Sequence, residues 1–241
     1  MERLFEFNKQ ETVGESQFEY HPPTLLALKE SFEQTKTVVV GETHGVVQNY
    51  DVYRFLIEKL EITKVGIELP EKQYGFLKNI DQSSLNDPFL LLKLRAVGFQ
   101  DGRINTDLLK FIVWLNQVKA KLYMFDNVGP NYRDLTEQES AAERDSVMAN
   151  EIYANNQPND KTLIIAGKHH TKIRDNSMAS FLSKQSKFTS INLIYSSGQH
   201  FNFGTKEFEP TGTDEDSIRL NEVEKKFELV IPSAKSVEVD F

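Results

Sequence analysis

Four segments of the chain repeat one arrangement: a short apolar run rich in β-branched residues, then a few polar or glycine residues, then a helical stretch. The runs are TVVV before GETHG, KVGIEL before PEKQYGFL, AKLYMFD before NVGPNYRDL, and KTLIIA before GKHHTK. Apolar runs of four to eight residues suit strands that are buried on both faces, and strands that alternate with helices indicate a parallel sheet. The pattern predicts an α/β fold with a central, mostly parallel β-sheet flanked by helices.

The rest of the chain supplies further helices and a different kind of ending. Helices are predicted over 24–35 after a double proline, over 84–97, and over 107–118 with Thr106 as the N-cap. A fifth run, FTSINLIY, leads through SSGQ to HFNFGTKEFEP, which is typical of an antiparallel hairpin, and KFELVIPSAKSVEVDF adds an edge strand or packs across the sheet. We expect one domain over 1–241, with a motif-bearing core at about 37–195 and the C-terminal hairpin and edge segment at about 196–241.

Composition and charge exclude several classes of function. The net charge is −8 and no long block of Lys or Arg occurs, so neither nucleic acid nor a membrane surface is expected as a partner. The chain has no cysteine, which removes thiolate zinc sites and cysteine nucleophiles. No apolar run approaches the roughly 20 residues of a membrane helix, and the N-terminus lacks an apolar signal region, so we expect a cytoplasmic protein. The serine-hydrolase, zincin, dinucleotide and P-loop motifs are also absent from the sequence.

Acidic residues and histidines stand where the predicted strands end. In an open α/β sheet, ligands bind at the carboxyl ends of the parallel strands, so these side chains should meet at one edge. They are Glu42 and His44 after the first run, Glu68 at the end of the second, Asp126 at the end of the third, and His169 and His170 after the fourth.

The motif GETHG is the most specific of these places. Glycines at 41 and 45 permit backbone angles or close approaches that a side chain would block. Residues two apart in an extended segment point the same way, so Glu42 and His44 should project together. The helix that begins near 46–49 would also direct its positive end to this edge. The alternative is a strand-to-helix turn in which the histidine is incidental.

The other candidates also have structural alternatives. Glu68 could cap the helix after Pro70, and an aspartate before NVGP, as at 126, is ordinary turn chemistry. Adjacent residues cannot both point at one site from regular structure, so only one of His169 and His170 belongs to it, and position alone leaves the choice open. The two remaining histidines, His21 and His200, are interpreted as surface residues, the latter in a hairpin turn.

A charged pair also falls on the inward side of a predicted helix, TEQESAAERDSVMANEIYANN. Arg144 and Asp145 lie on or beside its apolar face, and charge in such a place must be paired or functional. Arg144 is suited to hold a substrate carboxylate or a developing oxyanion. The alternative is a structural ion pair with Asp145 or Glu143.

Together these motifs resemble the superfamily that joins erythromycin esterase-like hydrolases, Tiki/TraB metal-dependent proteases and ChaN-type haem-binding proteins. The matching pieces are GETHG at 41–45, GIELP at 66–70, ERDSVMANEIY at 143–153 and IIAGKHH at 164–170. GETHG, the strand that ends in Glu and the ERDSVMANEIY segment look most like the erythromycin esterase branch. The spacing G-x-x-H at 167–170 looks like the second histidine motif shared across branches, which favours His170 over His169.

The esterase resemblance implies that a histidine general base activates water without a covalent intermediate. His44 would be the base, Glu42 and Glu68 would set its pKa or position the water, Arg144 would stabilise the oxyanion, and His170 would polarise the carbonyl or protonate the leaving oxygen. Asp126, Asp145 and His169 are assigned to substrate binding. The expected partner is a small-molecule substrate, no cofactor is expected, and the oligomeric state is left open.

Two other branches imply different functions for the same cleft. A Tiki-type hydrolase would hold zinc, manganese or cobalt on Glu42, His44, Glu68 and His170. A ChaN-type protein would bind a ligand such as haem through a histidine or tyrosine, without turnover.

Overall fold

The computed structural model describes residues 22–97, 101–127, 136–210, 217–221 and 226–237. The elements, in chain order, are α1 (Pro22–Thr35), β1 (Thr37–Glu42), α2 (Gln48–Leu60), β2 (Lys64–Ile67), α3 (Glu71–Tyr74), η1 (Gly75–Asn79), η2 (Ser84–Asn86), α4 (Pro88–Val97), α5 (Thr106–Gln117), β3 (Lys121–Met124), α6 (Glu137–Asn155), β4 (Thr162–Gly167), α7 (Lys168–Thr171), α8 (Met178–Ser183), β5 (Thr189–Tyr195), β6 (Gln199–Phe201), β7 (Thr205–Glu207), β8 (Ser217–Asn221) and β9 (Lys226–Ile231).

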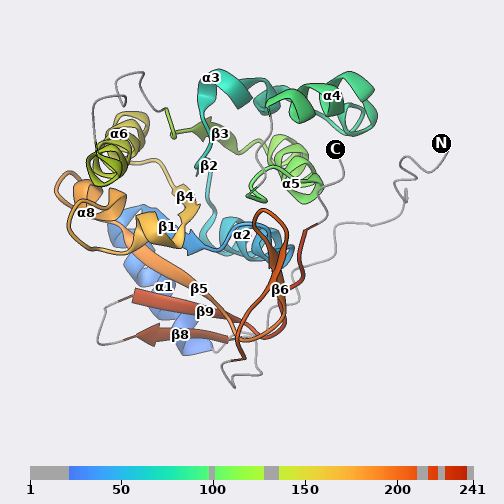
Figure 1. Ribbon diagram of the computed structural model, residues 1–241. Helices are drawn as coiled ribbons and strands as arrows, with labels where there is room; N and C mark the ends of the chain where they lie inside the picture. Colours follow the sequence, from blue (N-terminus) through green and yellow to red (C-terminus); the bar gives the residue numbers. More distant parts are fainter. Residues whose placement is uncertain (1–21, 98–100, 128–135, 211–216, 222–225, 238–241) are drawn as a thin grey trace.

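The main sheet has seven strands in the order β3-β2-β4-β1-β5-β9-β8. The first six run parallel, and β8 is antiparallel to β9. Strands β6 and β7 form a separate antiparallel pair, the red-orange hairpin in Figure 1. The predicted α/β class, with a mostly parallel sheet and a C-terminal antiparallel hairpin, is confirmed.

The valines of β1 explain why this strand is central. Val38, Val39 and Val40 have no exposed surface, and burial of such a side chain stabilises the fold by roughly 1.5–3 kcal/mol. Because side chains alternate along a strand, Val38 and Val40 belong to the larger core with α1, α2 and α5, whereas Val39 belongs to the smaller core with α6 and α8. Helices therefore cover both faces of the sheet (Figure 1).

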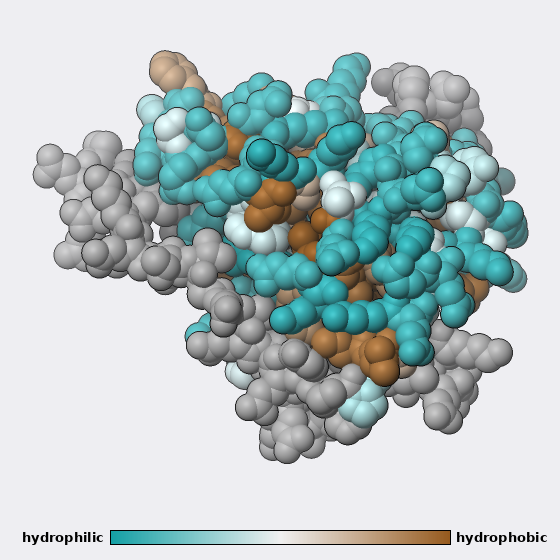
Figure 2. All heavy atoms as spheres, turned by 180° about the vertical axis from the view of Figure 1, so that it is seen from behind, coloured by the Kyte–Doolittle hydropathy of each residue, from teal (hydrophilic) through white to brown (hydrophobic). Residues whose placement is uncertain are grey.

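Most of the described surface on one face of the molecule is hydrophilic (Figure 2). Figure 2 shows one face of the molecule, on which hydrophobic residues gather in a central strip between polar ones. Large apolar side chains that are highly exposed are few in the described part of the chain, Phe89 and Phe203 being the most exposed. None of the helices in the described ranges has the length and apolar character that a membrane crossing requires.

Two helix predictions need correction. The predicted helix over 84–97 is interrupted, because η2 ends at Asn86 and α4 begins at Pro88. Proline lacks the N–H that a continuous helix would need there, but it is tolerated in a first turn. The N-cap of α5 is Asn105, not Thr106: the Asn105 side chain accepts a hydrogen bond from the Leu108 N–H at 2.8 Å.

The C-terminal part also differs from the prediction. FTSINLIY is not one arm of the hairpin, because β5 pairs in parallel with β1 and with β9. The hairpin turn lies at 202–204 instead of in SSGQ, and His200 lies in β6, half-buried, with its ring stacked 4.5 Å from that of Phe208. The predicted edge strand exists as β9, but β8 covers it and forms the edge of the sheet. His21 lies outside the described residues.

Candidate active site

The register of the sheet brings the predicted site residues to one edge. Glu42, the last residue of β1, is paired with Gly167 at the end of β4. Beyond the end of β2, the Glu68 N–H donates to the Ile165 carbonyl at 3.1 Å, and the Asp126 N–H donates to the Leu69 carbonyl at 3.2 Å. The ends of β1, β4, β2 and β3 are therefore aligned, as the parallel-sheet argument predicts.

Glu42 and His44 form a hydrogen-bonded pair, as their spacing predicts. The Nδ1 atom of His44 contacts Oε1 of Glu42. The carboxylate is buried at 6% exposure, while the imidazole is partly exposed. With Nδ1 engaged, the other ring nitrogen of His44, Nε2, faces Gly167 and Glu68: a side-chain carbon built onto Gly167 would lie 3.1 Å from it.

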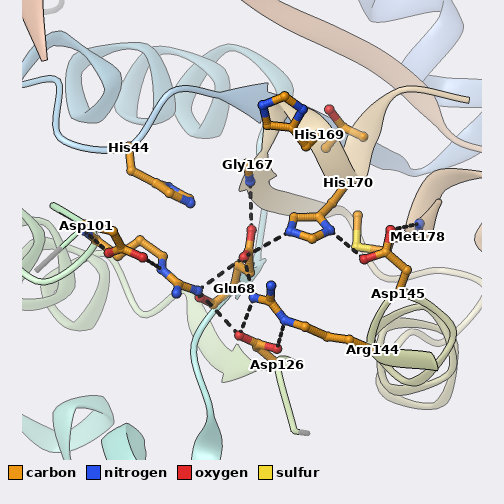
Figure 3. Close-up of polar contacts among 12 residues, drawn as sticks. His44, Glu68, Asp101, Asp126, Arg144, Asp145, Gly167, His169, His170 and Met178 are labelled. Atoms are coloured by element: carbon orange, nitrogen blue, oxygen red, sulfur yellow. Dashed lines mark hydrogen bonds and ion pairs between the residues drawn. The ribbon is translucent and has the colours of Figure 1, made fainter. Parts of the chain in front are cut away.

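His170 forms a second pair of the same kind with a carboxylate from α6. Its Nδ1 lies 2.5 Å from Oδ1 of Asp145, and Oδ2 of Asp145 accepts the Met178 N–H at 3.0 Å. The Nε2 atom of His170 is 3.5 Å from Oε1 of Glu68. His169 is exposed and points away from this cluster (Figure 3), so the structure brings His170, and not His169, to the site.

Glu68 occupies the centre of the cluster (Figure 3). Its Oε2 accepts the Gly167 N–H at 2.7 Å, and its Oε1 accepts from Nη2 of Arg144 at 2.8 Å and from Nη1 of Arg103 at 3.1 Å. It does not cap α3, because the first N–H of that helix donates to the side chain of Asn127.

Arg144 is held by carboxylates on other elements and not by its helix neighbours. Its Nε and Nη2 donate to the two carboxylate oxygens of Asp126 at 2.8 and 2.7 Å, a bidentate arrangement that also fixes the plane of the guanidinium group. No described residue contacts its third nitrogen, Nη1, within hydrogen-bond distance. The structural alternative, in which Arg144 pairs with Asp145 or Glu143, is therefore wrong, because the partners of Arg144 are Asp126 and Glu68.

Arg103 is a member of the cluster that sequence reasoning missed. Its Nε donates to Asp101 at 2.8 Å, and its Nη1 reaches both Glu68 and Asp126. Arg103 lies between α4 and α5 and not at the end of a strand. The positions of the strand ends therefore do not predict that it belongs to the cluster. The available signal was the Asp-Gly turn before it, since Gly102 has a φ of 84° and packs against the backbone of Gly45.

The electrostatic environment keeps Glu68 ionised. Burial by itself would raise the pKa of this carboxyl, but the neighbouring His44, His170, Arg103 and Arg144 outweigh burial and lower the pKa to about 2. For His44, burial lowers the pKa, while the charge and hydrogen bond of Glu42 and the charge of Glu68 raise it, and the net shift is upward. His44 therefore takes up a proton more readily than an ordinary histidine.

A small cavity opens beside His44. Its volume is about 30 Å³, and it is lined by Glu42, His44, Gly45, Tyr50, Tyr53, Ile67, Glu68, Leu69, Gly102, Arg103, Leu108, Phe111 and Ile165. A cavity with polar partners needs roughly 10–15 Å³ to hold a water molecule. This one therefore has room for water next to the imidazole, the carboxylates and a guanidinium group.

The loop that carries His44 is fixed by the C-terminal part of the chain. The carbonyl of Gly45 accepts the N–H groups of Phe201 and Val237, both at 3.0 Å, and the Val47 N–H donates to the Lys235 carbonyl at 2.9 Å. Backbone groups of Phe201, Lys235 and Val237 thus hold the loop.

Gly45 should not tolerate a side chain. Its φ is 77°, and an added Cβ would lie 2.2 Å from the Phe201 carbonyl oxygen. We expect Gly45→Ala to lower the free energy of unfolding by about 3 kcal/mol or more, measured by urea denaturation. Gly204→Ala is the matched control, because Gly204 also has a positive φ, 129°, but an added Cβ meets nothing within 4 Å. Equal losses in the two variants would contradict the packing argument.

Comparison with known proteins identifies the fold. No family model and no curated protein sequence matches the chain. Among solved structures, a mutant of the erythromycin esterase EreC in its open conformation superposes with a TM-score of 0.59 and 14% identity, over 90% of this chain and 95% of that one. The chain has the erythromycin esterase fold.

Two further structures share this fold. A protein from Bacillus cereus has a TM-score of 0.57 at 10% identity, over 90% of this chain and 93% of that one. A succinoglycan biosynthesis protein has a TM-score of 0.56 at 11% identity, over 90% and 92% of the two chains. The resemblance predicted from the motifs is thus confirmed for the erythromycin esterase fold, and the identities of 10–14% carry no statement about activity.

The side chains of this erythromycin esterase fold do not suit a metal ion. Both oxygens of Glu68 already accept hydrogen bonds, so this carboxylate is not open to a metal ion. Among the residues that the structure describes, no group of three or more His, Asp or Glu side chains is placed to hold a metal. Arg103 and Arg144 already form ion pairs with the Glu68 carboxylate, whose oxygens a divalent ion would need as ligands.

Proposed function

We propose that this protein hydrolyses a carboxylic ester or related acyl bond in a small molecule, with His44 as the general base. The observation that carries the proposal is the orientation of His44: Glu42 holds its Nδ1, and Nε2 faces the cluster beside a cavity large enough for water. A base must be within hydrogen-bond reach of the proton that it removes, and this arrangement supplies that geometry.

The proposed reaction starts with water in the cavity beside His44. Its oxygen attacks the carbonyl carbon while Nε2 of His44 takes one proton, so no covalent enzyme intermediate forms. Glu68 is ionised and fixed by the Gly167 N–H, and it accepts a hydrogen bond that orients the water. The imidazolium that forms on His44 is stabilised by the carboxylates of Glu42 and Glu68.

The rest of the reaction uses the groups on the other side of Glu68. The carbonyl oxygen becomes negatively charged during attack, and Nη1 of Arg144 supplies N–H donors for it. When the C–O bond breaks, the protonated form of His170 gives a proton from Nε2 to the leaving oxygen. The acid product carries the water oxygen, and His44 and His170 return to their starting forms by proton exchange with solvent. Asp126 and Asp145 hold Arg144 and His170 in place rather than contact the substrate.

A panel of carboxylic esters and lactones, with and without a chelator, tests the proposal. The protein is purified without metal-affinity resin and analysed for bound metal. Hydrolysis that resists chelation in metal-free protein supports the histidine-base mechanism, while loss of activity on chelation would favour the Tiki-type alternative. Absence of any hydrolysis, together with a Soret band on haem titration, would favour the ligand-binding alternative.

The pH dependence of kcat/KM provides a sharper test. His44 must be neutral to act as a base, and its pKa is raised by Glu42 and Glu68 above the ordinary value of 6.5. We therefore expect His44 to set the acid limb of the kcat/KM profile, which should rise with pH and have its midpoint above pH 6.5. Glu42→Gln removes one of the charges that raise this pKa, so the midpoint should move to lower pH while the rate falls. A midpoint that moves upward in Glu42→Gln would contradict the assignment of His44 as the base.

A further inference from the structure

Two buried polar side chains behind Glu42 have no part in the mechanism proposed above. Tyr195 is the last residue of β5 and Asn49 lies in the first turn of α2, and their exposures are 7% and 3%. The sequence motifs do not single out either residue as a site candidate. Both are connected to the His44 pair by hydrogen bonds.

The connection is a series of hydrogen bonds. Which group donates and which accepts in each bond follows from the groups involved. It starts at the backbone N–H of Thr43, which can only donate and lies 3.0 Å from the Tyr195 hydroxyl oxygen. The single hydroxyl proton of Tyr195 is then directed to Oδ1 of Asn49 at 2.8 Å. The amide nitrogen of Asn49 donates to Oε2 of Glu42 and to the Thr43 carbonyl at 2.9 Å.

This direction determines what Glu42 can do for the histidine. Its Oε2 accepts from Asn49, which leaves Oε1 for the Nδ1 atom of His44. A flipped Asn49 amide would place its oxygen against a carboxylate and against the Thr43 carbonyl, both acceptors, so the flipped arrangement is disfavoured. A carboxylate that accepts on both oxygens requires the proton between it and His44 to reside on Nδ1.

We propose that Asn49 and Tyr195 are positioning residues that hold the Glu42 carboxylate as an acceptor and thereby keep the neutral His44 in the tautomer with its proton on Nδ1 and its lone pair on Nε2. This role concerns the resting protein and does not depend on which reaction the cleft performs. It goes beyond the proposed function because it assigns residues that touch neither substrate nor water.

The hydroxyl group of Tyr195 takes part in these hydrogen bonds, whereas the packing of its ring does not depend on the hydroxyl group. The ring stacks on that of Phe208 with centroids 4.7 Å apart and planes at 4°. That contact survives removal of the hydroxyl oxygen. Tyr195→Phe therefore removes two hydrogen bonds next to the site and leaves the apolar contacts in place.

The tautomer can be measured directly, without a substrate. The probe is the intact protein labelled with ¹⁵N at histidine, studied by long-range ¹H–¹⁵N correlation spectra at a pH above the histidine titrations. Protonated and unprotonated ring nitrogens have distinct ¹⁵N shifts, and the spectrum of His44→Asn assigns the His44 signals. The variants are Tyr195→Phe and Asn49→Ala.

Tyr123→Phe is the matched control. It removes a buried tyrosine hydroxyl that donates to an asparagine oxygen, that of Asn156, at 3.2 Å, but this tyrosine has no contact with the site. We expect wild type and Tyr123→Phe to show His44 with its proton mainly on Nδ1, the form with the proton on Nε2 being a small minority. In Tyr195→Phe and Asn49→Ala, the form with the proton on Nε2 should become at least several-fold more populated than in the control.

Two results would overturn the proposal. One is a wild-type His44 that carries its proton on Nε2, as read from the wild-type spectrum once His44→Asn has assigned its signals. The other is a His44 tautomer in folded Tyr195→Phe that is indistinguishable from the control. If Asn49→Ala does not fold, the wild-type spectrum and Tyr195→Phe decide the question.

Discussion

Replacing Glu68 by alanine is expected to lower the free energy of unfolding by about 3–5 kcal/mol. Glu68 is 3% exposed and is the shared partner of Arg103 and Arg144. Removal of one member of a buried ionic cluster leaves the opposite charges without compensation, and that loss, more than the attraction itself, makes the change costly. Urea denaturation followed by circular dichroism measures the effect.

Glu61→Ala is the matched control for this prediction. Its carboxylate lies 2.8 Å from Lys161, the same separation as between Arg144 and Glu68, but the Glu61 side chain is 81% exposed. Water screens such a pair, so the control should lose far less stability than Glu68→Ala. Similar losses in the two variants would mean that the Glu68 cluster contributes little to stability.

Acid provides an independent measure of the same carboxylate. The pKa of Glu68 is lowered from 4.5 to about 2 in the folded protein. A lowered pKa contributes stability that is fully present above the unfolded-state pKa and is lost as the pH falls toward the folded-state value. The shift corresponds to about 3 kcal/mol, so the wild type should lose this amount between about pH 5 and pH 2. Glu68→Ala should lack this part of the acid dependence.

Replacing His44 by asparagine is expected to reduce ester hydrolysis by about 10²–10⁴-fold, which is the usual contribution of a general base. Asparagine keeps a polar group near Glu42 but has no basic nitrogen. Since His44 is partly exposed and its backbone loop is held by Phe201, Lys235 and Val237, the variant should remain folded. Initial rates on the ester that the panel identifies, beside thermal unfolding, measure both effects.

His169→Asn is the informative comparison, because it changes the same residue type on an exposed part of α7. The predicted substrate-binding role of His169 would appear as a raised KM with kcat unchanged. A loss of kcat in His169→Asn as large as in His44→Asn would contradict the assignment of the site. A large loss of stability in His44→Asn would instead favour the structural role of GETHG.

The sequence predicts the parts of the site that follow from regular structure. Residues at the ends of buried parallel strands must share one edge of the sheet, and this places Glu42, Glu68 and Asp126 together. The spacing of two residues pairs Glu42 with His44, and the inward face of α6 brings Arg144 to the cluster. These inferences needed only strand and helix periodicity.

The residues that were missed depend on tertiary contacts that periodicity does not encode. Arg103 reaches Glu68 from an irregular loop, and Asn49 resembles a surface residue in the first turn of a helix. Tyr195 was placed on one arm of a hairpin, although its strand lies inside the sheet. The sequence also does not predict that β9 pairs with β5, because the residues of a short apolar strand do not specify its neighbour in the sheet.

The bracing of the His44 loop has a consequence for how the protein is made. Gln48 and Lys235, which are hydrogen-bonded, are 187 positions apart. The ribosome therefore synthesises the GETHG segment early and residue 235 late, so a growing chain contains His44 before the contacts that hold its loop can form. Contacts of such long range slow folding. The His44 loop should consequently reach its final position in one late step, after residues 233–237 have been synthesised and docked.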